Sequence, residues 1–600
     1  MKIKTSTVLK DGYYCKKTYD HATGTTKITP LGKAAIVKEI LENIEDDSVE
    51  VRLSFEYQNR TKLCAISRET LFDRSGLKLL AGKGVDVTPT TYDCFVDSIR
   101  LQEEGREEAG VPVTSIYEKV GWIYLPAEYT NDDKVSRWAL CYRGGKLLGE
   151  FNAKYTGPYD LSTNGTYDAW KNMVQQEVIG HTAMELFLLA ALASVLLGLI
   201  SMDSSLENPI LHANYPSGRG KSTVANLCGS CFGPPYRGTK NLFDGDGSII
   251  RKQGIIQSWS STDNAVTSTQ AGNRGVVTIL DEFGKFSGSR LKDIVFNLSE
   301  GTDRLRLTSD LKARSLEGYS TVFLSMGETS LLDKCKAKLG GLQIRVLEVD
   351  SPLTDDADHS RRIKAVCKEH NGHAAPRLAQ YIIDGGGADF VYSIYNAWVY
   401  KLITEFPPSP SGERFVEKYA ALIMATAQIA GAALEIQFSE EALLEFFRDH
   451  ESTKGQERSI ESKSYETLLE VFRAEKAHFY QPTGGQPLSP CWGRVHYPNK
   501  VMNDTQILTE EYLVRPQFLR DKLKANGFNN IDTCIKYWKQ HGVLDYEDEK
   551  HPTKKRKIDP DSKGGERVYV LRVFEPVAEA GIETATAKRN IKVLSLKKDA

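Results

Sequence analysis

The stretch "NYPSGRGKST", residues 214–223, decides the fold because its second half has the pattern of a phosphate-binding loop. The usual spacing, G-x-x-x-x-G-K-[ST], places a glycine at position 215, where this chain has Tyr215. That outermost glycine mainly eases the exit from the preceding strand, so its replacement costs little. Gly218 and Gly220 still let backbone N–H groups approach a phosphate closely. The stretch therefore predicts a nucleotide site.

The residues of this loop have separate predicted roles. Lys221 supplies the charge that bridges the β- and γ-phosphates of ATP, and the hydroxyl of Ser222 is a ligand for Mg²⁺. Because both residues begin a helix, the helix dipole also favours an anion at this point. The predicted ATP-binding residues of the loop are Ser217, Gly218, Arg219, Gly220, Lys221, Ser222 and Thr223.

The flanking sequence gives the loop the context that it needs. "NPILHANY" before it reads as a short buried strand, and "KSTVANLCGSCF" reads as the helix that follows. Further along, "GVVTILDEF" offers a buried parallel strand, Val276 to Leu280, that ends in Asp281 and Glu282. Asp281 is predicted to bind ATP-associated Mg²⁺ through water, and Glu282 to orient or deprotonate the attacking water. Both acids lie at the edge where open α/β sheets bind ligands.

Composition sets the broad class. Six hundred residues predict two to four domains, and 40% hydrophobic with 26% charged residues is typical of a globular protein in water. The net charge of −2 gives no overall attraction to nucleic acid, so such contacts must come from local basic surface. The cysteines form no secreted disulfide framework and no signal core follows the first residues, which indicates a reducing cytoplasm.

Two further stretches have structural interpretations. The apolar run from Leu186 to Ile200 is shorter than a membrane span and predicts a buried helix, with no membrane partner. Cys228 and Cys231 form a CxxC without a second pair, so buried thiols are expected rather than zinc ligands.

The pattern of elements divides the chain into five parts. Residues 1–160 mix strands such as "VEVRLSFEY" (Val49 to Tyr57) with helices and predict a mixed α/β accessory or collar domain. Residues 161–385 predict an α/β nucleotide-binding domain, 386–485 a helical region, 486–575 a winged-helix domain and 576–600 a basic tail. The expected fold class is an α/β P-loop NTPase core between a mixed α/β N-terminal domain and a C-terminal winged helix.

The motifs together resemble a known family. "ILHANYPSGRGKSTVANL", "SWSSTDNAVTSTQA", "GVVTILDEFGK", "FLSMGE" and "LGGLQIRVLEV", in this order, look like a helicase-like AAA+ family of phages and mobile genetic elements. Its members include the self-loading replicative helicases of staphylococcal cassette chromosomes, which are similar to minichromosome-maintenance ATPases. The resemblance spans residues 45–385, is strongest from 205 to 350, and departs from the family at Tyr215. It implies a ring, expected as a homo-hexamer, that moves on DNA.

Under this resemblance, further residues acquire catalytic roles. Ser325, at the end of "TVFLS", stands where such ATPases sense the γ-phosphate, although a serine that merely ends a strand is the plain alternative. Arg345, expected on a strand after the sensor, could stabilise transition-state charge across a subunit boundary. Arg304 and Arg306 compete with it for that role, and surface salt bridges are the alternative for all three.

Between these motifs, "DRLRLTSDLKARSLEGYS" alternates on either side of Ser309 and Asp310, which favours a hairpin. Related ring helicases insert a pore hairpin at this place. Lys312 and Arg314 are therefore predicted to bind the phosphates of single-stranded DNA, with an ordinary solvated turn as the alternative.

The C-terminal sequence has the order of a winged helix. Two helices separated by "NGFNN" precede a strand, a charged loop and a second strand. Ile531, Ile535 and Trp538 share the buried face of the second helix, which Asn530 or Asp532 can cap. Packing against a protein partner and a nuclear-localisation signal at "KKRK" are alternatives to DNA contact. The predicted DNA-binding residues here are Lys536, Lys539 and the wing residues Lys554, Lys555, Arg556 and Lys557.

Two functions follow from these expectations. The leading one is an ATP-dependent DNA helicase or translocase that acts as an oligomeric ring in the replication of a phage or mobile element. The alternative is an ATP-dependent switch that clamps DNA, in initiation, loading or phage defence, without unwinding it. A decayed ATPase is disfavoured by the intact set of Lys221, Ser222, Asp281 and Glu282.

Overall fold

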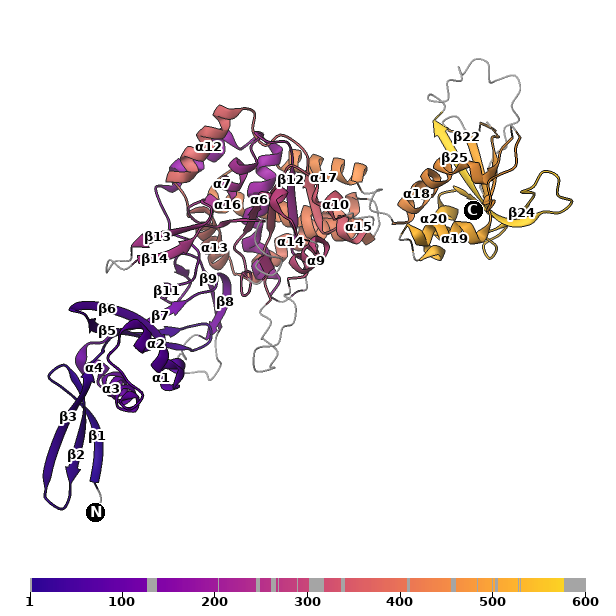
Figure 1. Ribbon diagram of the computed structural model, residues 1–600. Helices are drawn as coiled ribbons and strands as arrows, with labels where there is room; N and C mark the ends of the chain where they lie inside the picture. The colour runs from indigo at the N-terminus through magenta and orange to yellow at the C-terminus, as the bar shows by residue number, and fades with distance from the viewer. Residues whose placement is uncertain are drawn as a thin grey trace, which may run out of the picture. The chain divides into compact units, whose positions relative to one another are not determined.

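The protein is seen in a computed structural model, drawn in Figure 1. Its description covers residues 3–126, 138–202, 204, 206–243, 249–259, 266–267, 269–288, 290–301, 318–335, 340–406, 410–454, 460–482, 484–498, 500–501, 506–526, 528 and 530–576. The chain forms two compact units, and each is described by itself. The first comprises residues 1–331, 346–402 and 416–443, and the second comprises 332–345, 403–415 and 444–600.

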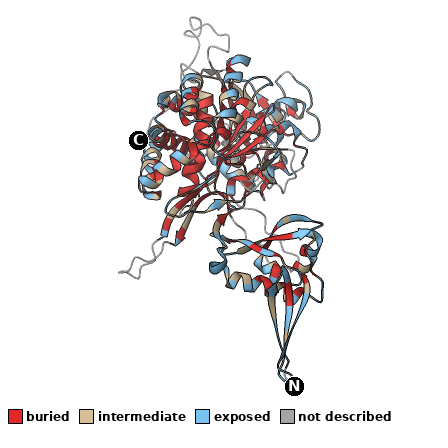
Figure 2. Cartoon of the chain, turned by 90° about the vertical axis from the view of Figure 1, so that its left-hand side faces the viewer, coloured by how far each residue is buried: buried red, intermediate tan, exposed pale blue. Residues whose placement is uncertain are grey.

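The first unit opens with an antiparallel meander and a mixed five-stranded sheet. Strands β1 (Ile3–Lys10), β2 (Tyr13–Asp20) and β3 (Thr25–Lys33) form a meander whose residues are mostly exposed, as Figure 2 shows near the N-terminus. A five-stranded sheet follows in the order β11-β7-β4-β5-β6. Its strands are β4 (Ile36–Asn43), β5 (Val49–Tyr57), β6 (Arg60–Ser67), β7 (Val113–Tyr117) and β11 (Lys154–Tyr155).

Helices cover this sheet and give it a core. They are α1 (Arg68–Phe72), α2 (Ser75–Lys83), α3 (Tyr92–Glu104) and α4 (Arg106–Ala109). Phe95 and Ile99 of α3 pack with Val51 and Leu53 of β5, all of them buried. The strand predicted from "VEVRLSFEY" is β5, and strands mixed with helices are found as expected in this part of the chain.

A parallel sheet forms the centre of the first unit. Its order is β15-β16-β17-β12-β18, so β17 separates β12 from β16. The strands are β12 (Ile210–Asn214), β15 (Ile256–Ser258), β16 (Thr278–Asp281), β17 (Phe323–Gly327) and β18 (Val346–Val349). These strands all pair in parallel, so they end at one common edge.

Helices surround this sheet. They include α5 (Tyr167–Glu177), α6 (Thr182–Ile200), α7 (Lys221–Ser230), α9 (Leu291–Glu300), α12 (Ala357–Glu369), α13 (Ala374–Asp384), α14 (Ala388–Glu405) and α16 (Ala421–Leu434). Among them, α6 and α16 are the most buried. Helix α6 is long and apolar enough to cross a membrane, but 94% of its apolar window is buried inside the fold. The buried helix predicted from Leu186 to Ile200 is therefore confirmed, and its all-round apolar surface is explained by its place at the centre of the core.

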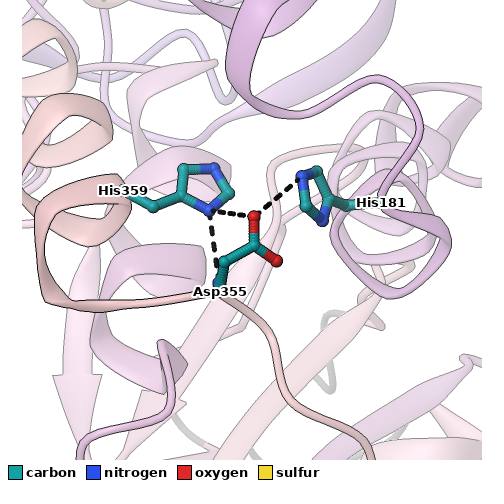
Figure 3. Close-up of side chains that lie close together, drawn as sticks. All are labelled: His181, Asp355 and His359. Atoms are coloured by element: carbon teal, nitrogen blue, oxygen red, sulfur yellow. Dashed lines mark hydrogen bonds and ion pairs between the residues drawn. The ribbon is translucent and has the colours of Figure 1, made fainter.

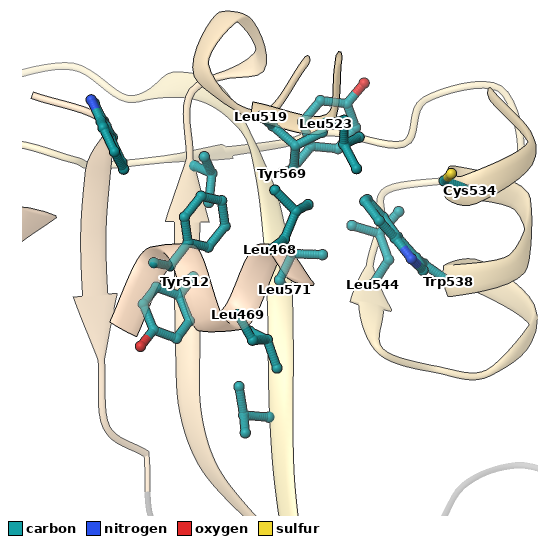
Figure 4. Close-up of a cluster of buried hydrophobic side chains, with 14 of the residues drawn as sticks. Leu468, Leu469, Tyr512, Leu519, Leu523, Cys534, Trp538, Leu544, Tyr569 and Leu571 are labelled. Atoms are coloured by element: carbon teal, nitrogen blue, oxygen red, sulfur yellow. The ribbon is translucent and has the colours of Figure 1, made fainter. Parts of the chain in front are cut away.

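The C-terminal part of the second unit combines helices with an antiparallel sheet. Helices α18 (Ile460–Ala474), α19 (Pro516–Ala525) and α20 (Ile531–Gln540) pack on the sheet β19-β20-β22-β25-β23. Trp538, Leu519, Leu523 and Leu571 meet in its core (Figure 4). Asn530 caps α20 by accepting a hydrogen bond from Thr533 N at 3.4 Å, which decides between the two predicted caps.

The predicted order of helix, helix, strand, basic segment and strand is observed, with one correction. The basic run is not a loop: Lys554–Arg556 forms strand β24, which pairs antiparallel with β25 (Glu566–Pro576). The strand forms because Lys554, Lys555 and Arg556 take up register with Val568, Arg567 and Glu566 of β25. The remaining strands are β19 (Phe479–Tyr480), β20 (Gly493–His496), β21 (Lys500–Val501), β22 (Gln506–Val514) and β23 (Leu544–Asp545).

One buried carboxylate ties α6 to the chain beyond α16. Glu185 is fully buried and accepts hydrogen bonds from Gly180 N at 2.7 Å, Ser439 N at 2.8 Å and Ser439 Oγ at 2.7 Å. Its removal takes away three hydrogen bonds to a carboxylate, and a hydrogen bond to a charged group is worth about 1.5–3 kcal/mol.

We expect Glu185→Ala to lower the free energy of unfolding by about 3 kcal/mol or more, measured by urea unfolding. Glu440→Ala, at an exposed position on α17 (Glu440–Lys454), is the matched control and should change it by less than about 0.5 kcal/mol. Equal effects of the two variants would contradict this role of Glu185.

Candidate functional site

The predicted phosphate loop joins β12 to α7, as the sequence pattern requires. Gly218 and Gly220 both have left-handed backbones, with φ of 80° and 95°. A Cβ at Gly220 would also lie 2.7 Å from the side chain of Thr354. Both the left-handed backbone and the lack of space therefore require glycine at this position. Leu353 N donates to Arg219 O at 3.0 Å, and this hydrogen bond ties the loop to the segment that follows β18. Ser217, Gly218 and Arg219 are exposed.

Tyr215 fits the loop because its position does not demand glycine. Its backbone is not in the left-handed region, and its N–H donates to Gly327 O at 3.3 Å. The carbonyl of Tyr215 accepts a hydrogen bond from Lys221 Nζ, which also donates to Pro216 O at 2.9 Å. Tyrosine supplies this carbonyl as well as glycine would, since the contact is made by the backbone.

Lys221 is partly buried and lies near two acidic side chains. Burial lowers the pKa of Lys221, and attraction to Glu328 and Asp281 opposes that shift. The side chains of Ser222 and Thr223 have different partners. Ser222 Oγ accepts from Arg237 Nη2 at 3.4 Å, whereas Thr223 is buried and its hydroxyl shares a hydrogen bond with Ser360 of α12. The side chain of Thr223 therefore ties the helix to α12.

The acidic pair stands at the carboxyl end of β16, as predicted. Asp281 has a nearly buried side chain, with 6% exposed, while that of Glu282 is 34% exposed. Glu282 has a left-handed backbone, with φ of 63°, and its N–H donates to Asp281 Oδ1 at 2.7 Å. A hydrogen bond from Lys285 at 2.8 Å is the main cause that lowers the pKa of Glu282, so its carboxylate is ionised.

Arg237 is the site residue that the sequence patterns do not reveal. Its guanidinium donates to Asp281 Oδ2, lies 3.3 Å from Glu282 Oε1 and reaches Ser222 Oγ. Three oxygens from two separate motifs thus converge on one cationic group. Arg237 lies between the phosphate-loop helix and β15, in a stretch without a recognised pattern, so no sequence signal marks it.

Ser325 lies within the sheet, and its hydroxyl has partners there. It is fully buried on β17, where His212 Nδ1 is 2.8 Å from its Oγ and Trp259 Nε1 donates to it at 3.0 Å. The β17 residue next to the last residue of β12 is instead Gly327. Direct contact of Ser325 with a phosphate would require these hydrogen bonds to be exchanged, and its sensor role stays a prediction.

Of the predicted catalytic arginines and pore residues, only Arg345 lies within the described residues. Arg345 is not on a strand as expected: it lies in the turn between α11 (Gly340–Gln343) and β18, and its Nη1 donates to Gly341 O at 2.9 Å. The turn forms because Arg345 N bonds to Leu342 O at 3.0 Å. Arg304, Arg306, Lys312 and Arg314 lie outside the described residues.

Two of the basic residues predicted to bind DNA are engaged within the C-terminal fold. Lys539 donates to Glu549 O at 2.6 Å, and Lys554 donates to Asp545 Oδ1 at 2.7 Å. The others, Lys536 on α20 and Lys555, Arg556 and Lys557 at β24, are exposed. A basic surface on α20 and β24 is thus formed mainly by these four side chains.

The CxxC pair is buried. Cys228 and Cys231 are both free, fully buried thiols, and burial raises the pKa of each. Both thiols are therefore protonated and unreactive, which agrees with the structural interpretation made from the sequence.

With this geometry described, comparisons with known proteins identify the family. The family model described as "Domain of unknown function (DUF927)" matches residues 4–317, more than half of the chain. The chain belongs to this family. A second model, "Cch helix turn helix domain", matches residues 459–575 of this DUF927 protein. A search of the curated proteins finds no match.

Among solved structures, one titled "SCCmec type IV Cch - active helicase" has the same fold. Its TM-score is 0.67 at 18% identity, and the match covers 96% of this DUF927 chain and 98% of the other. The resemblance inferred from the motifs is thereby confirmed, at the level of fold and through the Cch helix-turn-helix model. It also extends further than the predicted 45–385, since it includes the N-terminal layers and the C-terminal domain.

Proposed function

We propose that the protein is an ATP hydrolase of the AAA+ class that uses Mg²⁺ and acts on DNA. One observation carries the nucleotide part: Ser222 of the phosphate loop and Asp281 of β16 both contact a single guanidinium, that of Arg237. Oxygens that share one cationic group lie close enough to share a metal ion. The hydroxyl and the carboxylate are hard oxygen ligands of the kind that Mg²⁺ prefers.

The residues present fit the metal and the nucleotide. Ser222 and Asp281 would hold Mg²⁺, which neutralises charge on the phosphates when it is bound. The residues 217–223 would surround the phosphates with backbone N–H groups, and Lys221 would exchange its carbonyl partners for phosphate oxygens. Glu282, ionised and partly exposed, would orient the attacking water.

The proposed action on DNA rests on fold and surface. The fold is shared with a structure titled an active helicase, and the C-terminal part matches a helix-turn-helix model. We place DNA contacts on the exposed Lys536, Lys555, Arg556 and Lys557, and further contacts on Lys312 and Arg314. The domain boundaries inferred from the sequence, at about 160, 385, 485 and 575, belong to the same proposal.

The proposed assembly is a cytoplasmic homo-hexameric ring that replicates a phage or mobile element. Arg345 directly precedes β18, whose first residue, Val346, pairs with Ile210 at the amino end of β12. The phosphate loop leaves β12 from the opposite end. We propose that Arg345 acts in trans on a neighbouring subunit, as the resemblance to ring ATPases implies.

The first prediction tests hydrolysis. Glu282→Gln should lower ATP turnover about 100-fold, with and without single-stranded DNA, while nucleotide binding persists, because only orientation of the attacking water is lost. Turnover is measured by phosphate release, and Glu369→Gln at an exposed position of α12 serves as the matched control. In the unmodified protein, single-stranded DNA should raise turnover. Turnover that is indifferent to DNA would exclude the translocase and favour the clamping switch.

A second prediction concerns Arg237. Its guanidinium must leave Asp281 before Mg²⁺ binds there. Arg237→Gln should therefore lower the Mg²⁺ concentration required for half-maximal nucleotide binding by about threefold to fivefold. This factor corresponds to the loss of a competing ion pair worth about 1 kcal/mol. The measurement is a titration of Mg²⁺ at a fixed concentration of fluorescent ATP analogue. Arg251→Gln is the control, since Arg251 lies on β14 (Ile249–Gln253) outside this contact. A higher Mg²⁺ requirement would contradict competition and assign Arg237 to the nucleotide.

A third prediction concerns the basic β24. Neutralising Lys555, Arg556 and Lys557 together to Gln should reduce the salt dependence of DNA binding, the slope of log K against log salt, by about 2 to 3 units for all sequences alike. A control triple variant at the exposed and scattered Lys38, Lys78 and Lys368 has the same change of net charge. A slope that falls equally in both variants would show that net charge, and not this strand, sets the effect.

A further inference from the structure

Two histidines and an aspartate of the described chain form a compact group. One ligand atom from each of His181, Asp355 and His359 lies within 4.8 Å of the others (Figure 3). His181 immediately precedes α6, Asp355 lies in the segment after β18, and His359 is in the first turn of α12. Three elements that are distant in sequence therefore bring nitrogen and oxygen atoms to one point.

The ring of His359 is oriented as in a metal ligand. It is buried, with 2% exposed, and its Nε2 lies 2.7 Å from the carbonyl oxygen of Glu177, to which only an N–H can donate. In the neutral ring, the lone pair is then on Nδ1, which faces Asp355 and accepts a hydrogen bond from Asp355 N at 3.3 Å that a metal ion would replace. A backbone carbonyl that fixes the outer nitrogen is the usual support of a histidine that binds metal.

The distances suit coordination better than hydrogen bonding. Asp355 Oδ2 is 3.5 Å from His359 Nδ1 and 3.6 Å from His181 Nε2. Both separations exceed the ~2.7–3.2 Å of ordinary hydrogen bonds. They are close to the edge of a tetrahedron around a cation, about 3.3 Å for ligand bonds of ~2.0–2.1 Å.

We propose that His181, Asp355 and His359 form a binding site for a divalent transition metal ion of the Zn²⁺ type. Two imidazoles and one carboxylate are ligands that such ions accept, whereas Mg²⁺ prefers oxygen alone. The site is thus separate in chemistry from the one formed by Ser222 and Asp281. Its fourth position is left for water, because three protein ligands are supplied.

The bound ion holds the segment that supports the phosphate loop. Leu353, two residues before Asp355, donates its N–H to Arg219 O at 3.0 Å, and Thr354 packs against Gly220. Coordination fixes this segment to His181 at the start of α6 and to His359 in α12. The ion therefore has a structural role beside the loop, and its binding requires no nucleotide.

The test is metal binding by the full-length chain after removal of metal with a chelator. Titration with Zn²⁺ against a chromogenic chelator should give one tight site per chain, and His181→Gln and Asp355→Asn should each weaken it at least tenfold. Both side chains are partly exposed, at 36% and 68%, so the variants should fold, which circular dichroism verifies. His496→Gln, at an exposed histidine on β20, is the matched control and should bind as the unmodified protein does.

Co²⁺ distinguishes this site from the cysteines. Co²⁺ at His181, Asp355 and His359 should give visible absorption without a thiolate charge-transfer band, and Zn²⁺ should slow hydrogen exchange in residues 353–359 of the unmodified protein but not of His181→Gln. Absence of a tight site, a thiolate band, or equal affinity in all variants would overturn the proposal.

Discussion

The hydroxyl of Ser325 is the point on which the geometry of the central sheet depends. It lies between His212 of β12 and Trp259, which follows β15, and it hydrogen bonds to both. His212 in turn reaches Thr329 O at 2.9 Å, beyond the end of β17. Burial lowers the pKa of His212, so the ring is neutral and needs no counter-ion inside the sheet. These bonds tie β17 to its neighbour β12 and to the residue that follows β15, close to the phosphate loop and the acidic pair.

This arrangement explains how much of the site the sequence could predict. Loop and acids are local patterns: each follows its own strand, and parallel strands must end at one edge. Their meeting was therefore predictable from order alone. The tolerance of Tyr215 was predictable too, because it depends on backbone conformation, which the sequence pattern describes well.

The remaining features depend on tertiary contacts that no local pattern contains. Arg237 meets Ser222 and Asp281 only because the chain folds back past α7. Ser325 ends an apolar run and resembles a phosphate sensor, yet its hydroxyl is bonded to His212 and Trp259, which no local pattern reveals. In the C-terminal domain, Lys554 and Lys557 have the same charge in sequence, but only Lys554 has Asp545 within hydrogen-bonding distance. A basic run thus contains both structural and exposed cations, and only the fold separates them.

The position of Arg237 sets how its charge can be exchanged. Its backbone forms a bridge with Ile256 at the start of β15, so the guanidinium moves by side-chain rotation and not by displacement of the chain. Its side chain is 41% exposed, which leaves space for that rotation. Two adjacent carboxylates repel each other and require a nearby positive charge. Arg237 supplies this charge to Asp281 and Glu282, and a divalent ion at the proposed Ser222–Asp281 site would supply it in place of Arg237. The proposed exchange would therefore keep the two acids neutralised in both states.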